Sequence, residues 1–275
     1  VMGLSPALEG EEMPVDVDGF AGGDRTDIRL PRPQEELLKQ IHALGKPVVL
    51  VLLNGSALAV NWAAEHIPAI IEAWYPGQAG GDALADVLFG DYNPAGRLPV
   101  TFYKSVQDLP PFEDYRMEGR TYRFFRGEPL FPFGYGLSYT TFEINSLRVD
   151  QDEIAAGEQL NLSVEVTNTA NRAGDEVVQI YARDIAANIT RPVKKLIGFK
   201  RVSLEPGEKK TVTFTIYANQ LGSYDQQMEY VLEPGKIELM VGTSSVDIAY
   251  KTEIKIIGEE TVIGEDKVFF SEVVL

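Results

Sequence analysis

The chain has 275 residues, a formal net charge of −16 and no cysteine. So acidic a surface repels phosphate groups, which argues against a nucleic-acid partner. The lack of thiols excludes disulfides, thiolate nucleophiles and thiolate metal ligands. No apolar run reaches the ~20 residues that cross a bilayer, so we expect no membrane partner, and the length suits two domains.

The first residues, Val-Met-Gly, resemble the end of a buried strand, and an acidic loop follows them. Three glutamates, Glu9, Glu11 and Glu12, are crowded among glycines and prolines there. Four aspartates of the same stretch add to the charge: Asp16, Asp18, Asp24 and Asp27. Because the chain starts with the end of such a strand, we expect its natural beginning to be missing.

The segment "LPRPQEELLKQIHALGKPVVLVLLNG" predicts a helix followed by a strand. Pro31 or Pro33 suits the first helical turn, and Gly45 suits a C-terminal cap. An apolar stripe recurs at helical spacing through Leu37, Leu38, Ile41 and Leu44. The run "PVVLVLL" lacks alternation, as a strand buried on both faces does.

The same order of elements continues along the first half of the chain. A helix through Trp62 to about Glu65 precedes the strand-like "AIIEAWYPG", and the helical "GGDALADVLFG" closes at Gly90. Alternating strands and helices predict a mostly parallel sheet, whose ligands bind at the carboxyl ends of its strands. The acidic loop would lie at that edge.

His42 and His66 are the only imidazoles, and both fall in predicted helices. We interpret them as helix-surface side chains or as side chains with a hydrogen-bond partner. A serine–histidine catalytic triad therefore has weak support, and a histidine metal site is not expected.

The second half of the chain changes character. We predict an α/β domain over residues 1–142, with irregular chain from about residue 103, and an all-β domain over 143–275. Short alternating runs separated by turn signals predict an antiparallel sandwich: "LNLSVEVTNT", "GDEVVQIYARD", "KKLIGFKRVSL", "KKTVTFTIYAN", "MEYVLE" and "GKIELMVGTSS". The apolar tail "VFFSEVVL" needs a covering surface, such as another domain or a second copy in a homodimer.

Three interpretations compete for the acidic loop. One glutamate could act as a general acid, because crowded anions favour the protonated form of a carboxyl group. The loop could instead bind a hard cation such as Ca²⁺, although its spacing does not match an EF-hand. From spacing alone we favour the third interpretation, a solvated acidic turn without chemistry.

Longer motifs change that order. The stretch "GKPVVLVLLNGSALAVNWAAEHIPAIIEAWYPGQAGGDALADVLFGDYNPAGRLPVTFY", with "GRTYRFF" and "PLFPFGYGLSYTTF", resembles the C-terminal portion of glycoside hydrolase family 3, the β-glucosidases and β-xylosidases. The stretches "VEVTNTANRAGDEVVQIYARD" and "RPVKKLIGFKRVSLEPGEKKTVTF" are similar to its fibronectin type III-like domain. The resemblance implies α/β followed by all-β, and a separate or missing N-terminal (β/α)8-like barrel that carries an aspartate nucleophile.

The resemblance also implies site residues. Family members place the acid/base glutamate before a small residue, with an Asp-Arg pair further on. Glu9-Gly10 and Asp24-Arg25 fit this pattern, so we assign Glu9, with Glu11 and then Glu12 as alternates. Trp74 and Tyr75 could stack on a sugar in the leaving-group subsite or pack under their turn. Arg25 could orient an acidic neighbour or only neutralise charge.

The resemblance therefore implies a retaining, exo-acting β-glycosidase that acts on β-glucosides or oligosaccharides without a cofactor or metal. This chain would contribute the acid/base half of the site. A β-xylosidase of the same family is the alternative. The rival interpretation is a non-catalytic carbohydrate-binding or structural module with an inert acidic loop.

Overall fold

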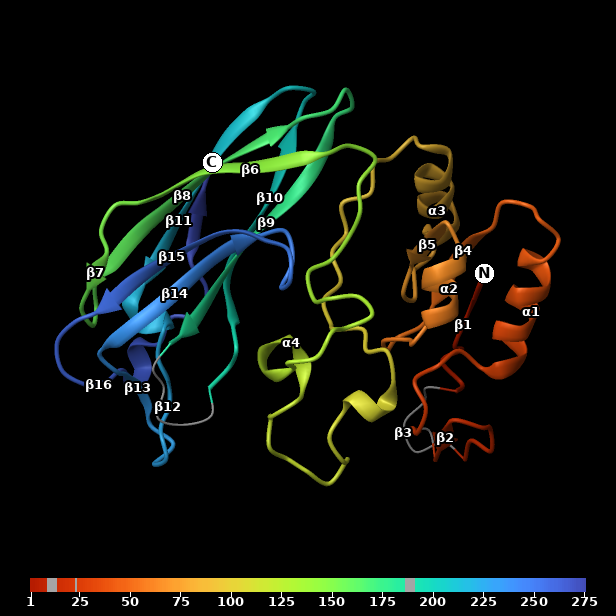
Figure 1. Ribbon diagram of the computed structural model, residues 1–275, viewed down its shortest axis with the longest axis horizontal. Helices are drawn as coiled ribbons and strands as arrows, with labels where there is room; N and C mark the ends of the chain where they lie inside the picture. The colour runs from red at the N-terminus through yellow and green to blue at the C-terminus, as the bar shows by residue number, and fades with distance from the viewer. Residues whose placement is uncertain (9–13, 23, 186–190) are drawn as a thin grey trace. The chain divides into compact units, whose positions relative to one another are not determined.

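The computed structural model describes residues 1–8, 14–22, 24–185 and 191–275 (Figure 1). The chain forms two compact units that are discontinuous in sequence. The first, here called the α/β unit, comprises Val1–Tyr92, Val100–Gly119 and Gly127–Phe131. The second, here called the sandwich unit, comprises Asn93–Pro99, Arg120–Arg126 and Pro132–Leu275.

A parallel three-stranded sheet forms the centre of the α/β unit. Its strands are β1 (Met2–Gly3), β4 (Val49–Leu53) and β5 (Ala69–Glu72), in the order β1-β4-β5. Both pairs of neighbouring strands are parallel. Three consecutive β4 residues are buried, so side chains on both faces of the sheet are covered, as the unbroken apolar run predicted.

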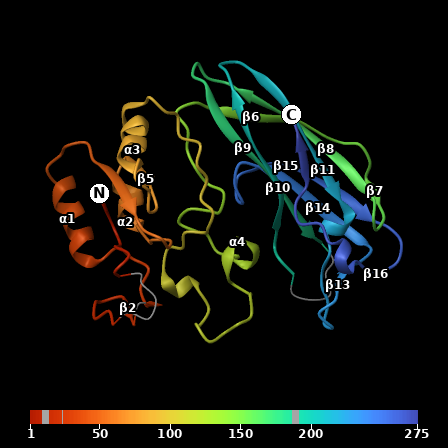
Figure 2. The ribbon, with the colours of Figure 1, turned by 180° about the vertical axis from the view of Figure 1, so that it is seen from behind.

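Three helices accompany the sheet: α1 (Arg32–His42), α2 (Asn61–His66) and α3 (Gly80–Phe89). Pro33 lies in the first turn of α1, as predicted, but the helix ends at His42 with Ala43 as its cap, so Gly45, with a φ of 67°, follows the cap rather than forming it. Helix α3 closes at a left-handed Gly90, which confirms that prediction. Figures 1 and 2 show α1 beside β1 from opposite sides.

One hydrophobic cluster joins α1 and α2 to the sheet. It combines Leu38 of α1, Leu50 and Leu52 of β4, and Ala63 of α2. Leu50 and Leu52 lie on the same face of β4 because strand side chains alternate, so α1 and α2 cover one common face. This agrees with right-handed crossovers in both strand–helix–strand connections.

Most of the chain between residues 103 and 141 is irregular. It contains a 3₁₀ helix, η1 (Val106–Asp108), and a short α4 (Thr121–Phe124). Phe102 and Phe131 form an isolated antiparallel bridge inside the α/β unit. In the sandwich unit, Tyr122 stacks on Phe133 at 4.1 Å, and its hydroxyl accepts a 3.0 Å hydrogen bond from Leu196 N–H.

Apart from α4 and two 3₁₀ helices, the sandwich unit is built from strands, and its two large sheets confirm the all-β prediction for the second half. One sheet has the order β10 (Lys195–Leu204), β9 (Gly174–Asp184), β14 (Gly235–Gly242), β15 (Ile248–Ile256) and β7 (Glu153–Ile154). The other has the order β17 (Glu272–Val274), β11 (Lys209–Tyr217), β8 (Gln159–Asn168) and β6 (Phe142–Val149). All neighbouring pairs are antiparallel except β15 with β7.

Smaller elements complete the sandwich unit. A third sheet contains β12 (Ser223–Tyr224), β13 (Tyr230–Leu232) and β16 (Thr261–Val262). Two 3₁₀ helices are η2 (Ala218–Gln220) and η3 (Gly264–Asp266). Side chains alternate along β8, where Leu160, Leu162, Val164 and Val166 are fully buried in the core between the sheets.

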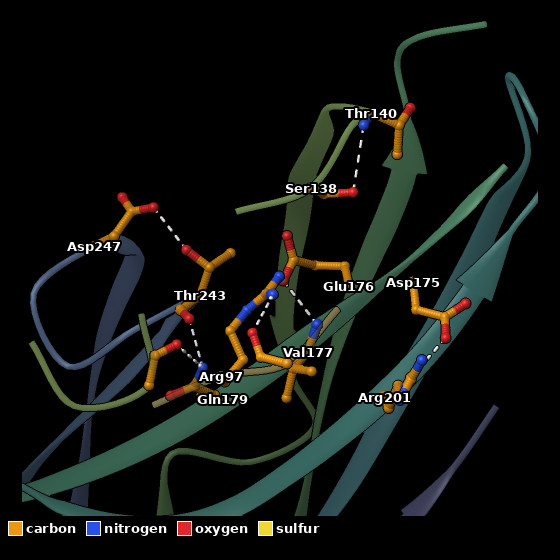
Figure 3. A network of polar contacts seen from close by, with 12 residues as sticks. Arg97, Ser138, Thr140, Asp175, Glu176, Val177, Gln179, Arg201, Thr243 and Asp247 are labelled. Atoms are coloured by element: carbon orange, nitrogen blue, oxygen red, sulfur yellow. Dashed lines mark hydrogen bonds and ion pairs between the residues drawn. The ribbon is translucent and has the colours of Figure 1, made fainter. Parts of the chain in front are cut away.

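A polar network holds irregular segments of the sandwich unit against β9 (Figure 3). The Arg97 guanidinium pairs with the Glu176 carboxylate at 2.5 Å, and both side chains are less than a tenth exposed. Gln179, also on β9, donates from Nε2 to the Gly134 carbonyl at 3.1 Å. A Cβ at Gly134 would lie 2.2 Å from the Gln179 amide oxygen, and Gly134 has a φ of 82°, so a larger residue would be strained and would displace the Gln179 side chain.

Lys195 on β10 gives the sandwich unit a pH-dependent stability. Burial, with the nearby positive charges of Arg123 and Lys267, lowers the pKa of Lys195 from 10.5 to about 8. Between these values the unfolded chain binds a proton that the folded protein does not, so stability rises with pH across that window. Below about pH 8 the folded protein carries the full cost of a buried ammonium.

We therefore expect Lys195→Met to raise the free energy of unfolding by about 2–3 kcal/mol at pH 7. The gain should shrink as pH rises from 8 to 10.5. The Gln220 carbonyl, which accepts from Lys195, keeps a second donor in the Tyr230 hydroxyl. Urea unfolding at several pH values measures this, with Lys200→Met on the same strand as control. Equal stability of the two variants at pH 7 would refute the prediction.

Candidate active site

The carboxyl ends of the three parallel strands bring together residues from distant parts of the chain. β1 ends at Gly3, Asn54 follows the last residue of β4, and β5 ends at Glu72. This is the edge of the sheet where the sequence predicted ligands to bind. The chain passes from β1 into the acidic loop at this edge.

The chain leaves β1 through a constrained glycine. Gly3 has a φ of 141°, and a Cβ there would lie 1.9 Å from the Leu53 carbonyl oxygen. Only glycine fits so close an approach of two backbones. The side-chain amide of Gln34 on α1 accepts from Gly3 N–H and donates to Gly3 C=O, each at 2.8 Å.

The next residues of the chain are also fixed. Leu4 is buried, and its N–H donates to the Leu53 carbonyl at 2.8 Å. The Tyr75 hydroxyl, from the segment after β5, donates to the Leu4 carbonyl at 3.0 Å. Residues 5–8 then form a turn closed by Leu8 N–H on the Ser5 carbonyl, and Leu8 packs against the hydrophobic cluster.

The three candidate acid/base residues come directly after this turn. Glu9, Glu11 and Glu12 lie within residues 9–13, outside the described part of the chain. The assignment of Glu9, with Glu11 and Glu12 as alternates, stays a prediction.

Further along the chain than the three glutamates, a short hairpin carries Arg25. Its strands are β2 (Phe20–Ala21) and β3 (Asp24–Arg25). The Arg25 guanidinium donates to the Asp27 carbonyl at 2.7 and 2.9 Å, and to the Ser56 hydroxyl at 3.2 Å, and it lies over the Phe20 ring. Arg25 therefore connects the hairpin to the turn that follows β4.

Asp27, close after the hairpin, forms an ion pair with Arg29. Its carboxylate accepts hydrogen bonds from the Arg29 guanidinium and from Arg29 N–H. The Arg29 guanidinium holds the pKa of Asp27 below its ordinary value. Asp27 is therefore ionised over the neutral range and is a poor proton donor.

Asn54 and Glu72 form a polar pair at the strand ends that the sequence did not reveal. Asn54 is fully buried, and its amide donates to the Ser56 carbonyl at 2.8 Å and to Glu72 Oε2 at 3.2 Å. Glu72 Oε1 accepts from Trp74 N–H at 3.0 Å. A polar residue directly at the end of a buried strand is the signal that could have found both.

This pair shapes the backbone that carries Trp74 and Tyr75. Trp74 has a φ of 53°, which is unusual for a bulky side chain, and its ring meets Phe102 edge-on. Such strained conformations cluster at functional sites. Tyr75 is 43% exposed. The role of both rings in sugar binding stays a prediction.

The two histidines lie away from this edge. His42 ends α1 and His66 ends α2, and each helix leads into the amino end of the next strand. His66 stacks on Trp62 at 4.5 Å, and His42 meets Trp62 edge-on at 5.5 Å. The structural interpretation of the histidines is therefore correct, although their convergence on one tryptophan was not foreseen.

Among the described residues, no group of three or more histidine or carboxylate side chains is arranged to hold a metal ion. In the same ranges, no helix combines the length and apolarity that crossing a bilayer requires.

Two family profiles match the chain. The glycosyl hydrolase family 3 C-terminal domain matches residues 1–139, and a fibronectin type III-like domain matches residues 176–245. The chain is 49% identical over 246 residues to a xylan 1,4-beta-xylosidase of Xylanibacter ruminicola, covering 89% of this chain and 28% of that protein. It is 43% identical to a periplasmic beta-glucosidase of Salmonella typhimurium, covering 82% and 31%.

Solved structures show the same relationship. A beta-glucosidase from Listeria innocua in complex with laminaribiose aligns with a TM-score of 0.75 and 38% identity, over 88% of this chain and 35% of that one. A beta-glucosidase from Erythrobacter marinus aligns with a TM-score of 0.81 and 39% identity, over 93% and 34%. The chain thus spans about a third of the length of these proteins. It belongs to glycosyl hydrolase family 3, as the family's C-terminal α/β domain followed by a fibronectin type III-like domain.

Proposed function

We propose that this chain supplies the general acid/base of a retaining, exo-acting β-glycosidase, with β-glucosides as the first substrate class. The observation that carries the proposal is the family match over residues 1–139, which includes the acidic loop. A second observation supports it, since the chain enters that loop at the carboxyl edge of the parallel sheet. Ligands of parallel sheets bind at this edge.

Glu9 would carry out two proton transfers. In the first step, its carboxyl group protonates the glycosidic oxygen as the bond to the anomeric carbon breaks. An aspartate on an N-terminal barrel attacks the same carbon and forms a glycosyl ester. In the second step, the Glu9 carboxylate takes a proton from water as that water displaces the aspartate. The sugar leaves with retained configuration, and both carboxyl groups return to their starting states.

The leaving-group side of the site would be built by this chain. Trp74 and Tyr75 follow β5 at the same sheet edge, and their rings would stack on the sugar that departs. Arg25 would orient an acidic neighbour in the loop. Its contacts to Asp27 and Ser56 support a role in holding the loop.

A β-xylosidase is the second candidate. It is favoured by the 49% identity to a xylan 1,4-beta-xylosidase and by 48% identity to a beta-xylosidase of Formosa agariphila. The barrel would contact the non-reducing sugar, so it would decide between glucose and xylose. The alternative to both enzyme activities is a non-catalytic carbohydrate-binding module.

The proposal is tested by assaying this chain alone and the protein joined to its barrel. We expect no turnover of aryl β-glucosides or β-xylosides by the chain alone, because the nucleophile is on the barrel. The joined protein should turn over one of them and release the β-anomer first, as followed by proton NMR. Release of the α-anomer would contradict retention, and an inactive joined protein would favour the non-catalytic module.

A further inference from the structure

Two side chains hold the backbone where the chain leaves β1, a few residues before Glu9. Gln34 belongs to α1, and Tyr75 belongs to the segment after β5. Gln34 hydrogen-bonds to the main chain of Gly3, and the Tyr75 hydroxyl hydrogen-bonds to the main chain of Leu4. Hydrogen bonds from two separate elements of the α/β unit therefore hold the start of the acidic loop.

The Gln34 contact is a two-point clamp. Its amide oxygen accepts from Gly3 N–H and its amide nitrogen donates to Gly3 C=O, each at 2.8 Å. A side-chain amide has the donor and acceptor that a neighbouring strand would offer. The clamp thus fixes the peptide orientation at Gly3, whose φ of 141° is a value that residues other than glycine rarely adopt.

The constraint extends to the residue before Glu9. The Leu4 carbonyl accepts from the Tyr75 hydroxyl at 3.0 Å, and the Leu4 side chain is buried. The turn of residues 5–8 closes through Leu8 N–H, and Leu8 packs on the cluster that also contains Leu38 of α1. A displacement of Gly3 would therefore be passed along this short, hydrogen-bonded segment.

We propose that Gln34 and the Tyr75 hydroxyl are positioning residues, which fix the start of the acidic loop so that Glu9 meets the glycosidic oxygen. This inference rests on the proposed function. Neither side chain transfers a proton. Each acts through the backbone of Gly3 or Leu4, so its loss displaces the acid without removing it.

Displacement of an acid has a kinetic signature. A basic leaving group, such as phenolate, needs the proton as the bond breaks, whereas 2,4-dinitrophenolate departs without it. A poorly placed acid should slow hydrolysis of the phenyl glycoside and leave hydrolysis of the 2,4-dinitrophenyl glycoside unchanged. General loss of folded protein would lower both rates by the same factor.

The test uses the protein joined to its barrel and measures kcat/KM for phenyl and 2,4-dinitrophenyl β-glycosides. Gln34→Ala is expected to lower the phenyl value by about 10- to 100-fold, because small misplacements in an active site cost that much. The dinitrophenyl value should change by less than about 3-fold, since it needs no acid. Tyr75→Phe, which keeps the ring, should show the same selectivity with a smaller loss.

Matched controls come from the same unit. Gln40→Ala changes an exposed glutamine of α1, and Tyr115→Phe removes the hydroxyl of a tyrosine that is 90% exposed. Both should leave both substrates unaffected. Gln34→Glu keeps an acceptor for Gly3 N–H but loses the donor to Gly3 C=O, so its selective loss should be smaller than that of Gln34→Ala.

The outcomes separate this inference from the proposed function. If Glu9→Ala lowers kcat/KM for both substrates by the same factor, the acid assignment fails and the positioning role fails with it. If Glu9→Ala is selective while the Gln34 and Tyr75 variants lose both activities equally, or neither, only the positioning role is overturned. If Gln34→Ala does not fold, the question is decided by Gln34→Glu and Tyr75→Phe. The measure is again the ratio of kcat/KM for the phenyl glycoside to kcat/KM for the dinitrophenyl glycoside.

Discussion

Glu9→Ala in the protein joined to its barrel is expected to lower kcat/KM for phenyl β-glucoside by about 10²–10⁴-fold, the usual contribution of a positioned acid. The loss arises because phenolate is a poor leaving group unless it is protonated as the bond breaks. Steady-state kinetics with a series of aryl glycosides measures it. The loss should grow as the leaving group becomes more basic.

The acidic loop supplies its own controls for this prediction. Glu11→Ala and Glu12→Ala remove the same charge and a side chain of the same size from the same loop. They should stay near the unmodified rate if Glu9 is the acid. A loss confined to Glu11→Ala would move the assignment to that residue, and no loss in any of the three would leave the acidic loop without a catalytic role.

Glu176→Ala is expected to lower the free energy of unfolding by about 3–5 kcal/mol. Its carboxylate pairs with Arg97 at 2.5 Å where the side chains are 9% and 8% exposed. The substitution strands the Arg97 charge in a poorly hydrated environment, and Arg97 Nε has no hydrogen-bond partner among the described residues. Urea unfolding followed by circular dichroism measures the change.

The neighbouring residue provides a matched control for that substitution. Asp175 pairs with Arg201 at the same 2.5 Å, but the Arg201 side chain is 49% exposed (Figure 3). Asp175→Ala should therefore cost only about 0–1 kcal/mol. Replacing Arg97 and Glu176 together with apolar residues should recover much of the lost stability. Equal costs for Glu176→Ala and Asp175→Ala would contradict burial as the cause.

Much of the fold was predictable because its elements follow simple periodicities. The apolar run before Asn54 forms β4, and the alternating "LNLSVEVTNT" lies in β8, where every second side chain is buried. The helix prediction for α1 was correct, but of its apolar stripe only Leu38 is buried, whereas Leu37 and Leu44 are exposed. Periodicity identifies the helix but does not show which side chains find a partner.

Two of the strands that the sequence analysis missed, β6 and β17, lack a regular pattern. Strand β6 shifts register between Asn145 and Arg148, and Ser146 has a φ of 59°, so its alternation is broken. Strand β17 has three residues, too few for a pattern. Strand β15 does alternate around the buried Ile254 and Ile256, so its signal was present. The domain boundary near residue 142 stays a prediction.

The sequence could suggest the candidate site only in outline. The order of strands and helices predicted ligands at the carboxyl edge, and the family resemblance led to the assignment of Glu9, which stays a prediction. The clamp of Gln34 on Gly3 joins residues 31 positions apart, and the pairing of Asn54 with Glu72 joins residues 18 apart. Such contacts depend on strand register and on helix rotation, which a single sequence does not specify.

The most direct measurement of the acid/base role is azide rescue of Glu9→Ala in the joined protein, with 2,4-dinitrophenyl β-glucoside as substrate. The glycosyl ester forms without the acid, but water lacks a base to attack it. Azide needs no base, so it should displace the aspartate, raise kcat by about 10²-fold and yield the β-glycosyl azide. Formation of that azide by Glu9→Ala, but not by Glu11→Ala or Glu12→Ala, is the result we predict. Its absence from Glu9→Ala, or its formation by Glu11→Ala instead, would contradict the account.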